Sequence, residues 1–404
     1  NMFYDQGGRH YWLSENLLDN GYEPTIFCAN TRHNFSDVVD LGNKNYKIKY
    51  SGQIPFVFVK TSEYKSNGFD RIKNMILFYK NLIKVSKRLE KKLGKPDIIL
   101  ASSVHPLTLK AGIKIAKRFG IPCICEIRDL WPESIIAYGL LKRKSILARI
   151  LYTGEKWLYK KADAIIMTWE GGKEYIIDQG WSKEIDISKI YYISNGLDIA
   201  TFDKNSEKFL IEDVDLDDNN IIKVVYAGSI RKVNNIGLLI DAAKIIENKG
   251  IDNIKFIIFG SGDEKEKLET RCKQEGIKNV IFKGYVNKKY IPSILKKADI
   301  NILHNSSTSL DKYGQSQNKL FEYLAAGKCI VQTYTTNYNI CKRYSCGIVC
   351  SKQTSEEIAD AILEVYKENE KRETMGKNAR KAAYDFDFKI LTQKLTSIIE
   401  SLID

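Results

Sequence analysis

Short apolar runs alternate with helix-like segments along most of the chain, and this alternation limits the folds that it can adopt. In the first half the segments between the runs have the spacing of helices. Continuous apolar strands between helices are typical of a parallel sheet covered by helices on both faces. We therefore expect an α/β fold, with strands in the first half at residues 97–101, 122–127, 163–167 and 189–193.

The alternation stops at 203–220, where the run 212–220 is acidic, rich in turn-forming residues and typical of a linker. It restarts at 222–228 and continues through the second half. A chain of 404 residues is long enough for two or three domains. We expect two doubly wound Rossmann-like domains. The first comprises residues 1–200 with a C-terminal helix at 386–404, and the second comprises residues 201–385.

The composition is that of an ordinary globular protein, with 44% hydrophobic and 28% charged residues. No apolar run reaches the length of ~18 residues that a membrane span needs, and no signal peptide opens the chain. None of the eight cysteines belongs to a CxxC pair, and the four histidines do not cluster with them. We expect no zinc site and a reducing, cytoplasmic location.

Positive charge is concentrated in the first half. The net charge is +13, and residues 1–200 contribute +10 of it. Such an excess indicates either a solvated basic surface or attraction to polyanions or an anionic membrane face. The helix-like segment 142–161 mixes cations with apolar residues, so it can lie on such a membrane or pack on the sheet. No nucleic-acid-binding module is recognisable, so nucleic acid is not an expected partner.

The most informative motif is the segment 316–328, SQNKLFEYLAAGK. It places Glu322 in the first turns of a short helix that Gly327 ends. The unpaired N–H groups of a helix N-terminus suit a phosphate, and a carboxylate one turn further on can accept hydrogen bonds from a ribose diol. The alternative is an amphipathic helix with a solvated glutamate. The first interpretation assigns donor phosphate binding to Ser316, Gln317, Asn318, Lys319 and Leu320.

Three other loops of the second half follow strands, where ligands of open parallel sheets bind. Gly228, Ser229, Arg231 and Lys232 suggest a clamp for a diphosphate, although a basic surface turn is the alternative. Gly260 and Gly262 form a weak GxG signal that is equally consistent with a plain strand–helix turn. Tyr285 follows the next strand, where the backbone could lie along the edge of a nucleotide base.

Two segments of the first half are candidate sites. Gly7 and Gly8 precede a helix and would let the backbone approach a phosphate, but no strand comes before them, which suggests that the native N-terminus is missing. Arg128 and Asp129 open a second segment, RDLWPE, after the strand 122–127. We assign Arg128 to donor binding; an Arg–Asp structural pair is the alternative interpretation. His105 also ends a strand, where a lone histidine is more often structural than catalytic.

Taken together, these motifs resemble the retaining glycosyltransferases of family 4, also called group 1, which have the GT-B fold. The resemblance covers nearly the whole chain and includes Asn195–Asp198 and the glycine at 347. The segment 128–133 resembles the branch that builds O-antigens and capsules, including N-acetylfucosamine transferases. The resemblance implies a nucleotide-sugar donor, with uridine as the expected base, held by the second domain across a cleft from the first.

The resemblance also implies site roles. Glu322 would match the family's ribose-binding second glutamate, whereas the first glutamate falls on Gly314 and the family's common arginine falls on Ser229. Arg231 and Lys232 are the expected substitutes that stabilise the departing diphosphate. The family implies no metal ion and no cofactor, and no dedicated protein base. Asp129 is a candidate for orienting the acceptor.

The expected acceptor is a polyprenyl-diphosphate-linked saccharide, bound by the basic first domain at the inner face of the cytoplasmic membrane. The expected function is therefore sugar transfer in surface polysaccharide biosynthesis. The alternatives are a nucleotide-sugar 2-epimerase of the same fold and an inactive sugar-nucleotide-binding subunit. The sequence does not identify the sugar, the acceptor linkage or the oligomeric state.

Overall fold

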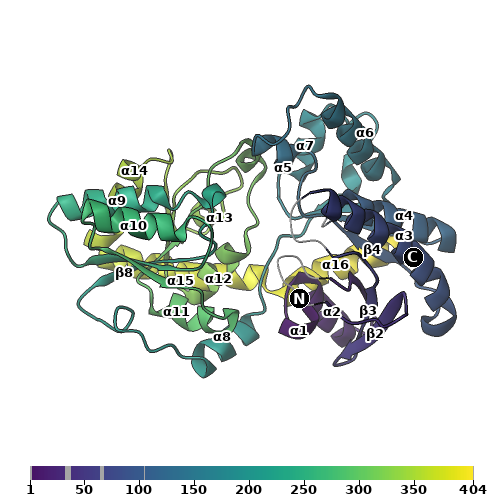
Figure 1. Ribbon diagram of the computed structural model, residues 1–404, viewed down its shortest axis with the longest axis horizontal. Coiled ribbons are helices and arrows are strands. Elements are labelled where there is room, and N and C mark those ends of the chain that lie inside the picture. Colours follow the sequence, from purple (N-terminus) through teal and green to yellow (C-terminus); the bar gives the residue numbers. More distant parts are fainter. Residues whose placement is uncertain (1, 32–37, 64–67, 104, 404) are drawn as a thin grey trace. The chain divides into compact units, whose positions relative to one another are not determined.

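The computed structural model describes residues 2–31, 38–63, 68–103 and 105–403 (Figure 1). The chain divides into two compact units. Unit 1 comprises Asn1–Ser194 with Phe388–Asp404, and unit 2 comprises Asn195–Asp387. The sequence analysis expected the divisions after residues 200 and 385, whereas the structure has them after 194 and 387.

Unit 1 contains a three-stranded sheet in the order β1-β3-β2. The central strand β3 (Ile54–Val59) is parallel to β1 (Ile26–Ala29) and antiparallel to β2 (Tyr46–Ser51). Its side chains alternate between two cores: Val57 and Val59 pack beneath α3 (Phe69–Leu93) and α4 (Pro106–Phe119), and Phe56 and Phe58 face the other side. The sequence analysis did not identify this sheet.

The second sheet of unit 1 is parallel and four-stranded. Its order is β4 (Ile99–Ser102), β5 (Cys123–Ile127), β6 (Ala164–Met167) and β7 (Ile190–Tyr192). Most residues of its strands are apolar, as is typical of a parallel sheet covered by helices, although β5 also contains the buried Glu126. The remaining helices of the unit are α1 (Met2–Asp5), α2 (Arg9–Asp19), α5 (Glu133–Ala137), α6 (Ile146–Lys161), α7 (Gly172–Asp178), the 3-10 turn η1 (Ile187–Lys189) and α16 (Phe388–Ile403).

Helix α16 completes unit 1 although it comes from the far end of the chain. Its residues Leu391, Leu395 and Ile398 are buried against Leu13 of α2 and against Ile124 and its neighbours on the sheet (Figure 1). The C-terminal helix thus covers apolar residues of α2 and of the sheet and completes the hydrophobic core of unit 1.

Unit 2 is a single six-stranded parallel sheet in the order β10-β9-β8-β11-β12-β13. The strands are β8 (Ile222–Ala227), β9 (Ile254–Phe259), β10 (Val280–Gly284), β11 (Ile300–Leu303), β12 (Cys329–Gln332) and β13 (Gly347–Val349). Alternate residues enter two cores, one on each face: Val225 and Phe259 in the first, Val224 and Ile258 in the second. This alternation is the doubly wound architecture predicted from the sequence.

Helices cover both faces of this sheet (Figure 1). They are α8 (Ile199–Lys208), α9 (Gly237–Asn248), α10 (Lys265–Glu275), α11 (Ile291–Lys297), α12 (Asn318–Ala326), α13 (Ile340–Arg343), α14 (Ser355–Lys367) and α15 (Asn369–Ala383). The 3-10 turns are η2 (Lys232–Asn234), η3 (Lys288–Tyr290), η4 (Ser309–Tyr313) and η5 (Tyr384–Phe386).

The acidic segment 212–220 lies inside unit 2 and does not carry the chain between the units. Its carboxylates are paired with lysines of that unit: Lys283 lies 2.8 Å from Asp213 and 2.5 Å from Asp215, and Lys297 pairs with Asp217. The segment is therefore held against the unit by its charge, which composition alone does not reveal.

Candidate functional site

The cation Lys319 lies at the carboxyl edge of the unit 2 sheet, in the first turn of α12. Its Nζ is 3.3 Å from the Tyr226 hydroxyl, 3.2 Å from the carbonyl oxygen of His304 and 3.3 Å from Oδ1 of Asn305. These partners belong to the end of β8 and to the loop after β11, which are adjacent strands. Desolvation lowers the pKa of Lys319 to about 8, although Glu322 opposes the shift.

Gly228 leaves room for this cation. A Cβ at Gly228 would lie 3.3 Å from Nζ of Lys319 and 2.8 Å from the Tyr226 hydroxyl. The ammonium group also lies 4.7 Å from the centre of the Tyr226 ring. The end of β8 is thus free of side-chain atoms beside a partly desolvated positive charge, an arrangement that suits an approaching phosphate.

Glu322 lies one turn after the start of α12, as the sequence predicted. Its side chain is 22% exposed, so the carboxylate reaches solvent, and its Oε1 is 3.4 Å from Nζ of the exposed Lys288. Leu320, by contrast, is fully buried in the core, where it anchors the helix. Only the backbone of Leu320 is available to a ligand.

Arg231 and Lys232 are both exposed at the turn η2. Within the described part of the chain, neither side chain has a hydrogen bond or ion pair, and no contact links either to Lys319. Ser229 instead donates to Asn234 (2.8 Å), whose amide donates to Asn305 (3.2 Å). Lys319 bonds the same Asn305, so the polar side chains after β8 join the Lys319 cluster and the two cations stay outside it.

Gly260 and Gly262 serve close packing of two loops. A Cβ at Gly260 would lie 1.8 Å from the Gly228 carbonyl oxygen, and one at Gly262 would lie 2.0 Å from that of Ile230. The Ile230 amide also donates to Ser261 (2.9 Å). These glycines let the loop after β9 pack against the loop after β8. They would therefore affect a ligand indirectly, by fixing the position of Gly228.

The residues before α12 hold the chain where it enters unit 2. The Ser316 hydroxyl accepts from the Asn195 amide (2.8 Å), and the Ser316 carbonyl accepts from the Asn195 side chain (2.7 Å). Gln317 is the N-cap of α12, and its buried Oε1 has no partner in the described structure. Asn318 is exposed.

Gly314 and Tyr285 are the remaining predicted positions of unit 2. Gly314 has φ +101° and carries no side chain where the resemblance expected a glutamate. Next to it, Gln315 is buried and donates to Gln332 (3.2 Å). Tyr285 follows β10 and is 72% exposed, so its ring is available to stack on a base.

In unit 1, Gly7 and Gly8 precede α2, and Gly8 is its N-cap with φ +101°. The next residue, Arg9, is buried and donates to Oε1 of Glu126 (2.7 Å). The other carboxylate oxygen of Glu126 bonds His10 (2.7 Å) and the Ser102 hydroxyl (2.6 Å). Burial opposes ionisation of this carboxyl, but Arg9 and His10 hold its pKa well below the usual range.

The segment 128–133 lies after β5 as predicted. Asp129 is exposed, and the Arg128 amide donates to the Ser103 hydroxyl (2.9 Å). Glu133 is buried and pairs with Arg143 and with the Tyr152 hydroxyl. The alternative interpretation, an Arg128–Asp129 structural pair, finds no hydrogen bond or ion pair among the described contacts, although the charge of Arg128 opposes the desolvation that raises the pKa of Asp129.

Sequence reasoning missed Glu155, a fully buried acid on α6. It accepts hydrogen bonds from Tyr159 (2.7 Å) and Tyr175 (2.8 Å), and burial raises its pKa to about 8. It also missed the Arg9–Glu126 pair, whose members are 117 residues apart and carry no local signal.

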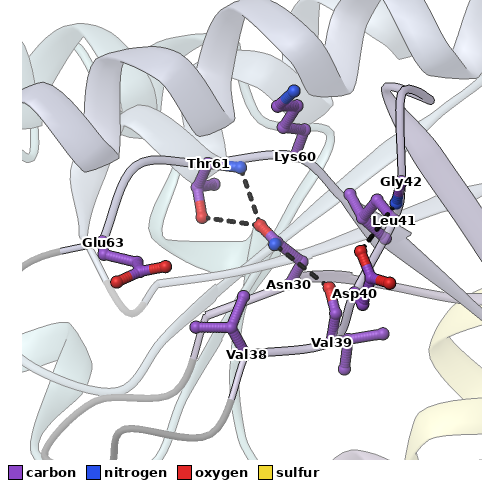
Figure 2. A pocket seen from close by; sticks show the side chains of 9 residues that line it. All are labelled: Asn30, Val38, Val39, Asp40, Leu41, Gly42, Lys60, Thr61 and Glu63. Atoms are coloured by element: carbon purple, nitrogen blue, oxygen red, sulfur yellow. Dashed lines mark hydrogen bonds between the residues drawn. The ribbon is translucent and has the colours of Figure 1, made fainter.

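A cavity of about 320 Å³ lies at the carboxyl ends of β1 and β3 in unit 1 (Figure 2). Asn30 crosses it: Oδ1 accepts from the amide (2.8 Å) and hydroxyl (3.1 Å) of Thr61, and Nδ2 donates to the Val39 carbonyl (3.3 Å). Lys60 and Glu63 also line it. None of the predicted site residues belongs to this cavity.

The described residues hold neither a metal-ligand cluster nor a helix that could span a membrane. They contain no group of three or more His, Cys, Asp or Glu side chains that could hold a metal ion. No helix among them has the length and apolar character that crossing a membrane requires.

Two family models match the chain, one in each half. Residues 208–382 match the family described as glycosyl transferases group 1, and residues 11–201 match glycosyltransferase family 4. A putative colanic acid biosynthesis glycosyl transferase, WcaI of Escherichia coli (strain K12), is 25% identical over 272 residues, which are 65% of this chain and 64% of the relative. The chain spans 61–66% of the length of three curated relatives, this one included.

Solved structures share the fold at low identity. Sucrose-phosphate synthase of Thermosynechococcus elongatus superimposes with a TM-score of 0.71 at 17% identity, covering 98% of this chain and 94% of that one. Alr3699/HepE of Anabaena, solved in complex with UDP, gives a TM-score of 0.63 at 15% identity and covers 87% of both chains. These similarities show the GT-B fold predicted from the sequence.

Proposed function

We propose that the chain is a glycosyltransferase that moves a sugar from a uridine-diphosphate sugar to a saccharide acceptor. The matches of its two halves to the group 1 and family 4 glycosyltransferase models support this activity. The observation that carries the donor assignment is the presence of Lys319 and Glu322 one turn apart on one short helix. A cation and a carboxylate one turn apart match the diphosphate and the ribose of such a donor. The UDP complex of HepE supports the choice of base.

The chemistry at the donor follows from its charge. As the anomeric C–O bond breaks, the electron pair stays on the diphosphate and the sugar becomes oxocarbenium-like. Lys319 and the first amides of α12 would stabilise that negative charge, and Arg231 and Lys232 would add a second, solvent-exposed layer. We further propose transfer with retention and without metal, in which the departing phosphate accepts the proton of the acceptor hydroxyl. Asp129 would orient that hydroxyl.

The acceptor part of the proposal concerns unit 1 and surface polysaccharide synthesis. We assign it a polyprenyl-diphosphate-linked saccharide at the inner face of the cytoplasmic membrane. Apolar side chains in the first turns of α6 and in the segment before it support membrane contact, since Leu140 is 80%, Ile146 76% and Ile150 62% exposed. The exposed cations Lys142 and Lys144 lie among them and would meet anionic lipid headgroups.

A donor screen tests the proposal. Wild-type protein is incubated with uridine- and other nucleotide-sugars, with and without lipid-linked acceptor. We expect stabilisation of the fold by UDP and UDP-sugars and sugar transfer only when acceptor is present. Epimerisation of the donor alone would support the 2-epimerase, and binding without any turnover would support an inactive subunit.

A further inference from the structure

Two buried nitrogens without partners lie at the carboxyl edge of the four-stranded sheet of unit 1. They are Nδ1 of His105, a residue only 8% exposed, and Nε of Arg128. His105 comes after β4 and Arg128 after β5, which are neighbouring parallel strands. The Ser103 hydroxyl joins the two loops by accepting from the Arg128 amide at 2.9 Å. Buried polar groups are normally hydrogen-bonded, so two orphans at one edge require an explanation.

A helix N-terminus lies at the same edge. His105 is the N-cap of α4, a helix of 14 residues, and its side chain does not cap the helix. The unpaired backbone groups and the dipole of a helix give its N-terminus a partial positive charge. Two of these features are positive, the guanidinium of Arg128 and the N-terminal end of α4, and the neutral imidazole of His105 lies beside them.

Two carboxylates interact with Arg128 through their charge without forming an ion pair with it: Arg128 helps to lower the pKa of Glu126 and opposes the desolvation that raises the pKa of Asp129. Glu126, the nearest buried acid, already has Arg9, His10 and Ser102 as partners. The guanidinium of Arg128 makes no ion pair among the described residues. Desolvation, with a smaller contribution from the charge of Arg71, lowers the pKa of His105 to about 4, so its ring is neutral near pH 7.

The tautomer of His105 fits a donor role. Its Nε2 lies 3.5 Å from the Thr108 hydroxyl, which can donate to it. In the tautomer in which the Thr108 hydroxyl donates, the proton of the neutral ring resides on Nδ1, the buried atom that has no partner. Nε of Arg128 is always an N–H donor, and in this tautomer Nδ1 of His105 is one too; donors to a missing acceptor point to an anion.

We propose that His105 and Arg128, with the N-terminus of α4, bind a phosphate group, and that this group belongs to the diphosphate of the lipid-linked acceptor. The second half of this inference depends on the function proposed above, whereas anion binding by unit 1 does not. It changes the assignment of Arg128 from the donor, as the sequence suggested, to the acceptor.

Binding of inorganic pyrophosphate tests the anion site. The titration uses full-length Lys319→Gln protein, in which the unit 2 site is weakened, and compares it with the double variants carrying Arg128→Gln, His105→Gln or Lys117→Gln. Lys117 is an exposed cation at the opposite end of α4 and serves as the matched control. We expect about tenfold or greater loss of affinity with Arg128→Gln and with His105→Gln, and no change with Lys117→Gln. Equal affinity in all four proteins would overturn the inference.

Steady-state kinetics identify the source of the phosphate. In the otherwise wild-type chain, Arg128→Gln should raise KM for a lipid-diphosphate acceptor about tenfold, leave KM for the donor unchanged, and leave KM for an acceptor analogue without phosphate unchanged. A rise in donor KM instead would overturn the acceptor assignment. If the wild-type chain transfers no sugar, the proposed function fails, and the pyrophosphate titration still decides the anion site.

Discussion

At the scale of single residues, the surroundings of Lys319 favour binding of the anionic diphosphate of the proposed donor. Its ammonium group is surrounded by three neutral oxygen atoms, and the nearest carboxylate, that of Glu322, only partly offsets the cost of desolvation. A cation held without a full counter-charge gains most when an anion arrives, because the anion supplies the missing interaction. Donor binding and cation burial are thus two aspects of one arrangement.

The pKa of about 8 gives Lys319 a testable pH dependence. The lysine loses its charge as the pH rises through 8, so the Kd for UDP should increase above pH 8 in the wild-type chain. In Lys319→Gln, UDP should bind about tenfold or more weakly at pH 7, and the dependence near pH 8 should disappear. Calorimetric titrations from pH 6.5 to 9.5 measure both effects, and an unchanged slope in the variant would contradict the role.

Glu155 predicts an effect on stability that is independent of catalysis. Its pKa is raised from 4.5 to about 8 in the folded chain, so between these values the folded state binds more protons than the unfolded one. The free energy of unfolding should therefore fall with increasing pH in this window, by up to about 1.4 kcal/mol per pH unit from this group. Glu155→Gln should make the free energy of unfolding depend less on pH. Urea unfolding of both proteins at pH 5.5 and 7.5 measures this difference. Parallel slopes for the two proteins would refute the assignment.

At the scale of elements, the loops after β8 and β9 form one packed unit rather than two independent turns. Gly260 and Gly262 allow the second loop to lie directly on the backbone of the first. Helix α12 then presents Lys319 to the end of β8. The donor site is therefore built by loop packing as much as by the residues that would touch the ligand.

Gly262→Ala tests this packing, because the added Cβ would lie 2.0 Å from the Ile230 carbonyl oxygen. We expect a loss of several kcal/mol of stability, or a displaced loop with weakened UDP binding. Gly154→Ala is the matched control: it lies within α6, nothing is within 4 Å of its Cβ, and it should stabilise the chain by about 0.5–1 kcal/mol. Equal melting temperatures for Gly262→Ala and the wild type would contradict the packing argument.

Elements with strong local patterns were predictable from sequence. The apolar strands of both parallel sheets and the helix carrying Glu322 appear where the sequence placed them, because periodicity and a terminal glycine are local signals. The cluster around Lys319 was not predictable, since Tyr226 and Asn305 are 93 and 14 residues away from it. Spacing alone favoured Arg231 and Lys232, and it could not reveal that both are solvent-exposed while Ser229 and Asn234 join the cluster.

At the scale of the whole molecule, the chain crosses from unit 1 to unit 2 and back, and the two crossings meet. The Leu197 amide donates to the Phe386 carbonyl (3.2 Å), and the Ile199 amide donates to the Asp387 carboxylate (3.4 Å). The return passage delivers α16 to unit 1, so unit 1 is discontinuous in sequence while unit 2 is continuous. The stability of unit 1 consequently depends on the last residues of the chain.

Leu395→Ala should expose this dependence. Leu395 is 1% exposed in the core that α16 shares with α2, so its truncation should cost about 2–5 kcal/mol. Ile390→Ala, at a position of the same helix that is 38% exposed, should cost much less. Hydrogen exchange locates the effect: faster exchange should be confined to unit 1, and faster exchange throughout unit 2 would contradict the division into two units.

The affinity of UDP for Glu322→Ala tests the central claim most directly, namely that α12 holds the ribose and diphosphate of the donor. Glu266→Ala, which removes an exposed acid from the first turn of α10, is the control. The account predicts that UDP binds Glu322→Ala at least about tenfold more weakly than the wild type, while Glu266→Ala binds normally. A Kd for Glu322→Ala equal to that of the wild type, in a chain that melts at the same temperature, would contradict it.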